Sequence, residues 1–223
     1  KTDLAQSFQR LEYLPPVYTF DRVELDIALD PTRTIIKSRI EVLPGKSFKP
    51  GLPLVLVGHE LEFVSLRVNG VPHRQFELTP ETLTIQALPN EGKEKFIVEI
   101  ICVCVPEKNT SLMGLYVSNG NFFTQCEAEG FRRITYFLDR PDVMASYSVT
   151  LRADRAKYPV LLSNGNLVGQ GDLEDGRHYA KWVDPHKKPC YLFALVAGQL
   201  VAREQRILSR SGKAHLLQVF VRP

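Results

Sequence analysis

Residues 23–42, VELDIALDPTRTIIKSRIEV, carry the clearest signal for the fold class. In the first half Val23, Leu25 and Ile27 alternate with acidic residues, and Ile40 and Val42 continue the pattern beside charged neighbours. Successive side chains of a β-strand point to opposite faces, so this period of two is typical of strands with one buried face. The sequence therefore predicts an all-β protein.

Tight turns are predicted on both sides of this stretch. Asn-Gly and Asp-Gly pairs readily adopt the positive φ angles of a two-residue hairpin turn. Four such pairs occur, at Asn69-Gly70, Asn119-Gly120, Asn164-Gly165 and Asp175-Gly176. We expect each of them to connect two strands.

Two further runs are apolar at nearly every position. They are FIVEIICVCV at 96–105 and CYLFALVAGQLV at 190–201, where Gly198 permits a bulge or a close approach. A continuous apolar run predicts a strand that is covered on both faces. The last expected strand is HLLQVFV at 215–221.

Composition and charge exclude several classes of protein. The chain has 223 residues and a formal net charge of +3, which gives no electrostatic case for binding nucleic acid. No run of 18 apolar residues occurs, so no membrane span is predicted. The first residues lack the apolar core of a signal peptide, which favours a cytoplasmic protein. The length suits one large all-β domain or two small ones.

The four cysteines, Cys102, Cys104, Cys126 and Cys190, match no zinc-ribbon spacing. Cys102 and Cys104 lie in an apolar run, where cysteine behaves as a small hydrophobic residue. We therefore predict buried free thiols, with a disulfide or a metal site as the alternative. Cys126 has polar neighbours and is a candidate nucleophile, but nothing near it in the sequence would lower its pKa, so we predict a structural thiol.

A search for catalytic machinery finds none in this chain. His59-Glu60 begins like the zinc signature H-E-x-x-H, but position 63 is Phe. The five histidines show no metal-ligand spacing, and neither a phosphate-binding glycine loop nor G-x-S-x-G occurs. We therefore predict no catalytic residue and no bound metal in this chain.

The most polar candidate site lies in residues 122–143, FFTQCEAEGFRRITYFLDRPDV. If the segment is extended, Gln125, Glu127 and Glu129 project to one side and Cys126 to the other. A carboxylate beside an amide oxygen is a good receptor for an ammonium group, because such hydrogen bonds are charge-assisted. The alternative is that these residues are ordinary surface carboxylates.

Other polar residues receive structural interpretations. Short helical turns are predicted at the N-terminus and after Asp139, with Asp139 and Asp142 as cap residues and Pro141 in the first turn. The basic pairs Arg132-Arg133 and Lys187-Lys188 are interpreted as solvated surface, and Trp182 as core.

Long segments of the chain resemble the aminopeptidase N family of zinc metallopeptidases, and its bacterial, plant and apicomplexan branch in particular. The resemblance is carried by KNTSLMGLY at 108–116, FFTQCEAEGFRRITYFLDRPDVMASY at 122–147, residues 158–201 and RSGKAHLL at 210–217. It implies an all-β, saddle-shaped, multi-sheet N-terminal domain over residues 1–223. It also implies that the zinc-binding catalytic domain follows Pro223.

The same resemblance implies roles for individual residues. Glu127 would anchor the free α-amine of a peptide substrate and Gln125 would line the first specificity pocket, while no role is carried over for Glu129. A non-proline cis bond is expected between Glu127 and Ala128. The implied partners are peptides with a free N-terminus and the catalytic domain of the same polypeptide, and the implied cofactor is zinc held outside this chain.

The expected function is therefore a part of a hydrolase that releases N-terminal amino acids from peptides and is inactive alone. The alternative is a non-catalytic β-sandwich binding or interaction module, and a protease inhibitor or pseudoenzyme is a third interpretation. The presence of H-E-x-x-H downstream in the gene would distinguish the first two.

Overall fold

A computed structural model describes residues 10–223, and in this range the protein is all-β. It has β-strands joined by loops and short 3-10 helices, and no α-helix occurs in the described range. The 3-10 helices are η1 (Arg10–Glu12), η2 (Pro89–Gly92), η3 (Pro106–Lys108), η4 (Phe131–Arg133), η5 (Glu174–Gly176) and η6 (Cys190–Leu192). The all-β prediction is confirmed, and η1 supplies a helical turn near the N-terminus. Residues 1–9 lie outside the described range.

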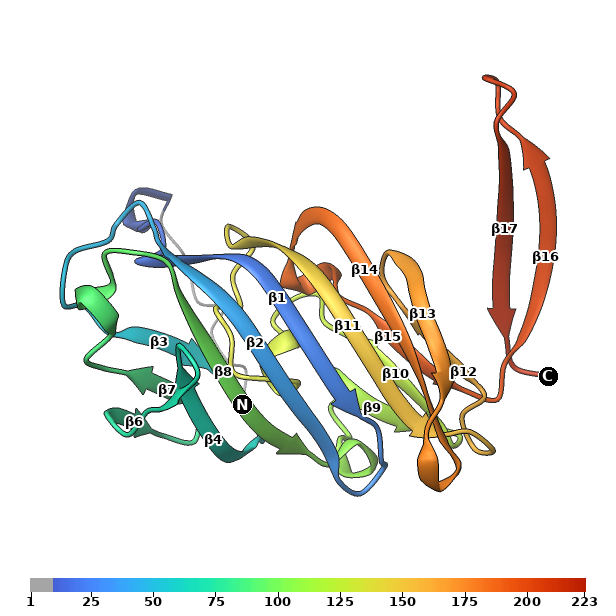
Figure 1. Ribbon diagram of the computed structural model, residues 1–223, viewed down its shortest axis with the longest axis horizontal. Coiled ribbons are helices and arrows are strands. Elements are labelled where there is room, and N and C mark those ends of the chain that lie inside the picture. The colour runs from blue at the N-terminus through green and yellow to red at the C-terminus, as the bar shows by residue number, and fades with distance from the viewer. Residues whose placement is uncertain (1–9) are drawn as a thin grey trace, which may run out of the picture.

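The largest element is a mixed eight-stranded sheet that runs across the molecule (Figure 1). β1 and β11 are parallel, and all other neighbours in it are antiparallel. Its strands, in spatial order, are β13 (Asn166–Asp172), β14 (Arg177–Pro189), β11 (Met144–Asp154), β1 (Tyr18–Ala28), β2 (Thr34–Pro44), β8 (Phe96–Cys104), β4 (Glu62–Val68) and β5 (Val71–Pro72).

The alternation in residues 23–42 explains the two faces of this sheet. Val23, Ile27, Ile36 and Ile40 are fully buried. The charged residues between them lie on the opposite face, which is open to solvent. One face of the sheet therefore builds the core, as the period of two predicts.

Two smaller sheets pack against the buried face. The first consists of β12 (Val160–Ser163), β15 (Leu195–Gly198), β10 (Asn121–Gln125) and β9 (Gly114–Ser118), and it lies behind β11 and β14 in Figure 1. The second consists of β3 (Leu54–Val57), β7 (Thr82–Ile85) and β6 (Phe76–Leu78). The core is one cluster of apolar side chains from all three sheets.

Aromatic rings join the large sheet to the loop after β10. Phe20 lies 4.8 Å from Phe137, and Phe137 lies 4.6 Å from Phe131, measured between ring centroids. Phe131 also contacts Phe193 at 5.1 Å and Tyr147 at 6.3 Å. Edge-to-face pairs at these distances add to the stability that burial of the rings supplies.

The last two strands, β16 (Val201–Leu208) and β17 (Ala214–Val221), form a hairpin that projects from the rest of the molecule (Figure 1). Within the described residues neither strand pairs with another sheet. Almost every residue of the hairpin is exposed, and the core cluster ends at Ala197. The strand predicted at 215–221 is confirmed.

Three of the four predicted hairpins are confirmed. Asn69-Gly70 joins β4 to β5, Asn119-Gly120 joins β9 to β10, and Asp175-Gly176 lies between β13 and β14. Asn164-Gly165 adopts positive φ at the glycine, but it connects β12 and β13, which belong to different sheets. The predicted positive φ is present at Gly165 but not at Asn164, and the predicted strand pairing was wrong.

The two apolar runs differ from their predictions. In β8 the residues from Phe96 to Ile101 alternate between buried and half-buried, and only Cys102–Cys104 are buried on both faces. The run at 190–201 is not one strand. It begins with η6, closed by the Phe193 amide donating to the Cys190 carbonyl at 3.0 Å, and β15 covers only Leu195–Gly198. The strand predicted at 96–105 is therefore confirmed over Phe96–Cys104, but cover on both faces is confirmed only at its end. In the run at 190–201 Leu192 and Val201 are each about half exposed, so continuous burial was wrong there as well.

No helix among residues 10–223 has the length and apolarity needed to cross a membrane. Trp182 is partly buried against the core and donates from Nε1 to the Leu161 carbonyl at 3.1 Å. It packs against the core cluster without being fully buried in it, so its interpretation as a core residue is confirmed in part.

Candidate functional site

The candidate loop begins where β10 ends, at Gln125. Cys126 is 2% exposed, whereas Gln125, Glu127 and Glu129 are exposed. The chain then reverses in a turn, closed by the Gly130 amide donating to the Cys126 carbonyl at 3.0 Å. An extended segment was expected here, but the chain is not extended past Gln125. Cys126 nevertheless points away from the polar residues, as expected.

Two backbone features shape this turn. The peptide bond between Glu127 and Ala128 is cis, as the resemblance predicted, and Glu129 has a φ of 74°. Gly130 is required by close packing, because a Cβ there would lie 2.3 Å from the Gln125 carbonyl oxygen and 2.8 Å from Cys126 Cα. Glycine thus lets the turn fold back onto the end of β10.

The turn forms one wall of a pocket of about 270 Å³. The pocket is lined by Glu127, Ala128, Glu129, Asp139, Arg140, Pro141 and Tyr191. Three residues singled out from the sequence, Glu127, Ala128 and Glu129, therefore come together with two segments distant in the chain. Gln125 does not line this pocket, and its Nε2 donates to the Glu127 carbonyl at 2.8 Å.

Arg132 and Asp139 connect the turn to the opposite wall. Arg132 donates to Asp139 Oδ2 from its backbone amide at 3.1 Å and from Nε at 2.9 Å. The Asp139 side chain is 3% exposed and the Arg132 side chain 14% exposed. Two sequence interpretations are corrected here, because Arg132 is not solvated surface and Asp139 caps no helical turn. The Asp139 carboxylate instead accepts hydrogen bonds from the backbone amide and the guanidinium of Arg132, which lies in η4.

The interpretation of the basic pair Lys187-Lys188 as solvated surface is wrong for Lys188. It is 8% exposed, its Nζ lies 2.7 Å from Asp184 Oδ2, and it stands 4.3 Å over the centre of the Tyr147 ring. Burial lowers the pKa of Lys188, while the bond to Asp184 acts in the opposite direction. Lys187 remains on the surface beside Asp21.

The charges around the pocket are unequally paired. Arg132 Nη2 lies 3.4 Å from Glu129 Oε1, and Arg140 makes a two-pronged contact with Asp142 at 2.9 and 2.7 Å. Hydrogen bonding to Arg140 holds the pKa of Asp142 below its usual value. Within residues 10–223 no cation pairs with Glu127. The pocket therefore presents one unneutralised carboxylate.

The cysteines serve as packing residues. All four are buried and unpaired, which confirms the predicted burial. Burial raises the pKa of the Cys126 thiol to about 12, and the nearby Asp139 acts in the same direction. At neutral pH the reactive thiolate form of Cys126 is therefore scarce, which favours its structural role.

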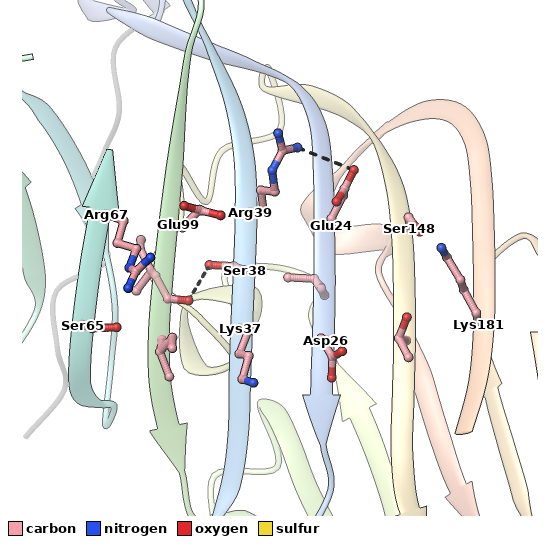
Figure 2. A pocket seen from close by; sticks show the side chains of 14 residues that line it. Glu24, Asp26, Lys37, Ser38, Arg39, Ser65, Arg67, Glu99, Ser148 and Lys181 are labelled. Atoms are coloured by element: carbon pink, nitrogen blue, oxygen red, sulfur yellow. Dashed lines mark hydrogen bonds and ion pairs between the residues drawn. The ribbon is translucent and has the colours of Figure 1, made fainter. Parts of the chain in front are cut away.

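A second cavity, of about 400 Å³, lies on the open face of the large sheet (Figure 2). Glu24, Arg39, Glu99 and Arg67 follow one another across β1, β2, β8 and β4, so their charges alternate in sign. Arg39 Nη1 is 3.7 Å from Glu24, and Asp26 is bound by Arg152 at 2.8 Å. Because positive and negative side chains alternate across the strands, the cavity presents no single sign of charge to a ligand, and we interpret it as part of a mixed-charge surface. No functional role was predicted for these residues from the sequence.

Among residues 10–223 no group of three or more His, Cys, Asp or Glu side chains converges in a way that could hold a metal ion.

Comparison with known proteins assigns the chain to a family. The model of the Peptidase M1 N-terminal domain matches residues 20–192, which is most of the chain. The chain belongs to this family. Aminopeptidase N of Haemophilus influenzae is 43% identical over 220 residues, and Aminopeptidase N of Escherichia coli is 43% identical over 221 residues. The resemblance inferred from the sequence is therefore confirmed.

Solved structures show the same fold. An aminopeptidase A of Legionella pneumophila, crystallised with aspartic acid, superimposes with a TM-score of 0.88 at 35% identity, and the match covers 96% of this chain and 25% of that one. An M1 zinc metallopeptidase of Deinococcus radiodurans gives a TM-score of 0.77 at 16% identity over 91% of this chain and 47% of that one, which supports the fold alone. The all-β fold is thus that of the M1 N-terminal domain.

The M1 domain described here is only part of its relatives' length. The matches cover 98% and 99% of this chain but 25% of each of the two aminopeptidase N relatives. What those whole proteins do therefore enters below as a proposal.

Proposed function

We propose that this chain is the N-terminal domain of a zinc-dependent aminopeptidase that releases N-terminal amino acids from peptides. In this proposal Glu127 binds the α-ammonium group of the substrate. Gln125, which does not line the Glu127 pocket, contributes to a separate pocket for the first side chain that the part of the polypeptide following this chain completes. The chain carries no catalytic residue of its own and contributes to binding.

One observation carries the proposal. Glu127 lines a pocket in which the other ionised groups, Glu129, Asp139 and Arg140, already have partners of opposite charge. A carboxylate without a cationic partner attracts a cation, and charge-assisted hydrogen bonds are the stronger ones. A peptide with a free N-terminus supplies such a cation.

The proposed role of Glu127 is to position the substrate. An aminopeptidase must select the terminal residue, and a carboxylate held at a fixed distance from the reacting carbonyl aligns one residue for cleavage. The zinc ion, when bound by the part of the polypeptide that follows this chain, would polarise that carbonyl and activate water. Glu127 transfers no proton in this scheme.

Gln125 supports the role through its amide. Its Nε2 already donates to the Glu127 carbonyl, which leaves the amide oxygen available as an acceptor. An oxygen acceptor beside Glu127 suits an ammonium group or a polar first side chain. This assignment is proposed together with that of Glu127.

The first prediction separates this chain from the longer polypeptide. We expect residues 1–223 with added zinc to hydrolyse aminoacyl fluorogenic substrates more than about 1000-fold more slowly than the polypeptide that includes the downstream region, because the zinc chemistry is absent. The measurement is turnover per mole of purified protein. Turnover that co-purifies with residues 1–223 would contradict it, and an inactive long polypeptide would favour the non-catalytic binding module.

We further propose that the β16–β17 hairpin packs against the part of the polypeptide that follows it. A two-stranded hairpin alone is marginally stable in water, and this one shares no core with the body. It exposes Leu216, Leu217 and Val219, each at about half of its surface or more. The family match also ends before it, at residue 192. A single domain over residues 1–223 stays a prediction. If the hairpin packs against the part that follows it, the domain would end near Gly198.

The second prediction tests this contact by hydrogen exchange. Backbone amides of residues 201–221 should exchange at least about 100-fold more slowly in the long polypeptide than in residues 1–223, because only the former covers the hairpin. Amides of β1 and β2, inside the large sheet, serve as the control and should be protected in both proteins. Equal protection of the hairpin in both would contradict the proposal.

The proposed compartment is the cytoplasm. Four buried thiols that are all unpaired suit a reducing environment.

A further inference from the structure

Asp139 links the three segments that line the Glu127 pocket, which are residues 127–129, residues 139–141 and Tyr191. It lines the pocket itself, it binds Arg132 next to the Glu127 turn, and it accepts a hydrogen bond from Cys190, the neighbour of Tyr191. We propose that Asp139 is a positioning residue that fixes Glu127 in its substrate-binding place, with Arg132 as the connecting group. This inference rests on the proposed function of Glu127.

The connection to the Glu127 turn is made by several bonds in a fixed arrangement. Arg132 donates to Asp139 Oδ2 from two of its nitrogens and to the Asp139 carbonyl from Nη2 at 3.2 Å. The same Nη2 lies 3.4 Å from Glu129 Oε1. The guanidinium is a planar fork, so one arginine can hold Asp139 and Glu129 at once in one geometry. Glu129 is two residues from Glu127 in the same turn.

The connection to the third wall is made by a thiol. Cys190 Sγ donates to Asp139 Oδ1 at 3.0 Å, so both carboxylate oxygens of Asp139 are used. Cys190 is 1% exposed and begins η6, which carries Tyr191 into the pocket. A substitution of Asp139 should therefore shift the Glu127 turn and Tyr191 as well as its own segment.

Burial makes this arrangement sensitive to substitution. The Asp139 side chain is 3% exposed, and a buried charge that loses its partner is costly. Without the carboxylate, Arg132 has only the exposed Glu129 as an ionic partner and can turn toward it or toward Glu127. Either movement would displace or neutralise the carboxylate that is proposed to bind the substrate amine.

The effect should appear in binding and not in chemistry. In the long polypeptide, Asp139→Asn keeps the size of the side chain and removes its charge. We expect KM for free-amine aminoacyl substrates to rise roughly 10-fold, the lower end of the effect known for residues that orient metal ligands, with kcat changed less than about 2-fold. The measurement is steady-state kinetics at a temperature where the variant remains folded.

A double-mutant cycle separates positioning from a merely structural role. If Asp139 acts through Glu127, Asp139→Asn should raise KM by less than about 2-fold in a protein that already carries Glu127→Ala, because coupled residues are not additive. An undiminished increase in KM in that background would overturn the inference. An effect on kcat alone would overturn it as well.

Two further outcomes keep this inference distinct from the proposed function. If Glu127→Ala leaves KM unchanged, the proposed function fails. If Glu127→Ala raises KM and Asp139→Asn does not, only the positioning role fails. Should Asp139→Asn not fold, Arg132→Lys serves in its place, since Lys keeps the charge but cannot bind Asp139 and Glu129 together. We expect the same KM increase and the same non-additivity from it, and additivity would overturn the inference.

Discussion

Glu127→Ala in the long polypeptide is expected to lower kcat/KM for peptides with a free N-terminus roughly 10- to 150-fold, mainly through KM. A hydrogen bond to a charged group contributes about 1.5–3 kcal/mol, and each 1.4 kcal/mol corresponds to a factor of ten. The reason lies in the charges around the pocket. Arg132 and Arg140 already pair with other carboxylates, whereas Glu127 has no cationic partner among the described residues. Loss of Glu127 leaves the substrate ammonium without its proposed counter-charge.

Selectivity provides a second readout of the same variant. The wild-type protein should prefer a free-amine substrate to its N-acetylated analogue, and Glu127→Ala should reduce this preference because the interaction that reads the charge is gone. Glu127→Gln, which keeps a hydrogen-bond acceptor without the charge, should fall between the two. Steady-state kinetics on the matched pair of substrates measure all three proteins.

The control for Glu127 is a carboxylate of similar exposure elsewhere on the surface. Glu77, in β6 of the three-stranded sheet, is exposed and does not line the pocket. Glu77→Ala should leave KM and kcat within about 2-fold of wild type, as surface substitutions away from a site usually do. A KM for Glu127→Ala no larger than that of Glu77→Ala would remove Glu127 from the binding site.

Much of this fold was predictable because its signals are local. Alternation in residues 23–42 identified two strands and their buried face, and three of four Asn-Gly or Asp-Gly pairs marked true hairpins. The failures occurred where the backbone depends on distant contacts. The run at 190–201 is apolar but only partly buried, since Leu192 and Val201 are each about half exposed. It is divided between η6 and β15, and composition alone cannot separate a short helix from a strand.

The candidate site shows the same division. The sequence identified the residue types of the turn, and the family resemblance assigned Glu127 and Gln125 their proposed roles. The sequence did not show that Asp139 links several segments of the site, because a carboxylate before Arg-Pro-Asp resembles a helix cap. Of its two side-chain partners, Arg132 is 7 residues away but was interpreted as solvated surface, and Cys190 lies 51 residues away in the chain. Contacts of that separation come from the packing of whole sheets and leave no local pattern.

Phe131→Ala is expected to lower the free energy of unfolding by about 3–5 kcal/mol, the usual cost of removing a fully buried aromatic ring. Phe131 is 0% exposed and contacts Phe137, Phe193 and Tyr147. It therefore joins the loop after β10 to β11 and to the segment after η6. Small domains are stable by only about 5–15 kcal/mol, so this loss is a large fraction of the total. Urea denaturation followed by circular dichroism measures it.

Matched variants show whether buried ring volume is the cause. Phe131→Leu keeps most of the apolar volume and should cost clearly less than Phe131→Ala, while Leu208→Ala, at a side chain 74% exposed on the hairpin, should change stability by less than about 0.5 kcal/mol. Phe131 directly follows Gly130, which closes the Glu127 turn, so a folded Phe131→Ala protein should also bind substrate less tightly. A loss below about 1 kcal/mol would mean that the rings around Phe131 do not hold this turn against the core.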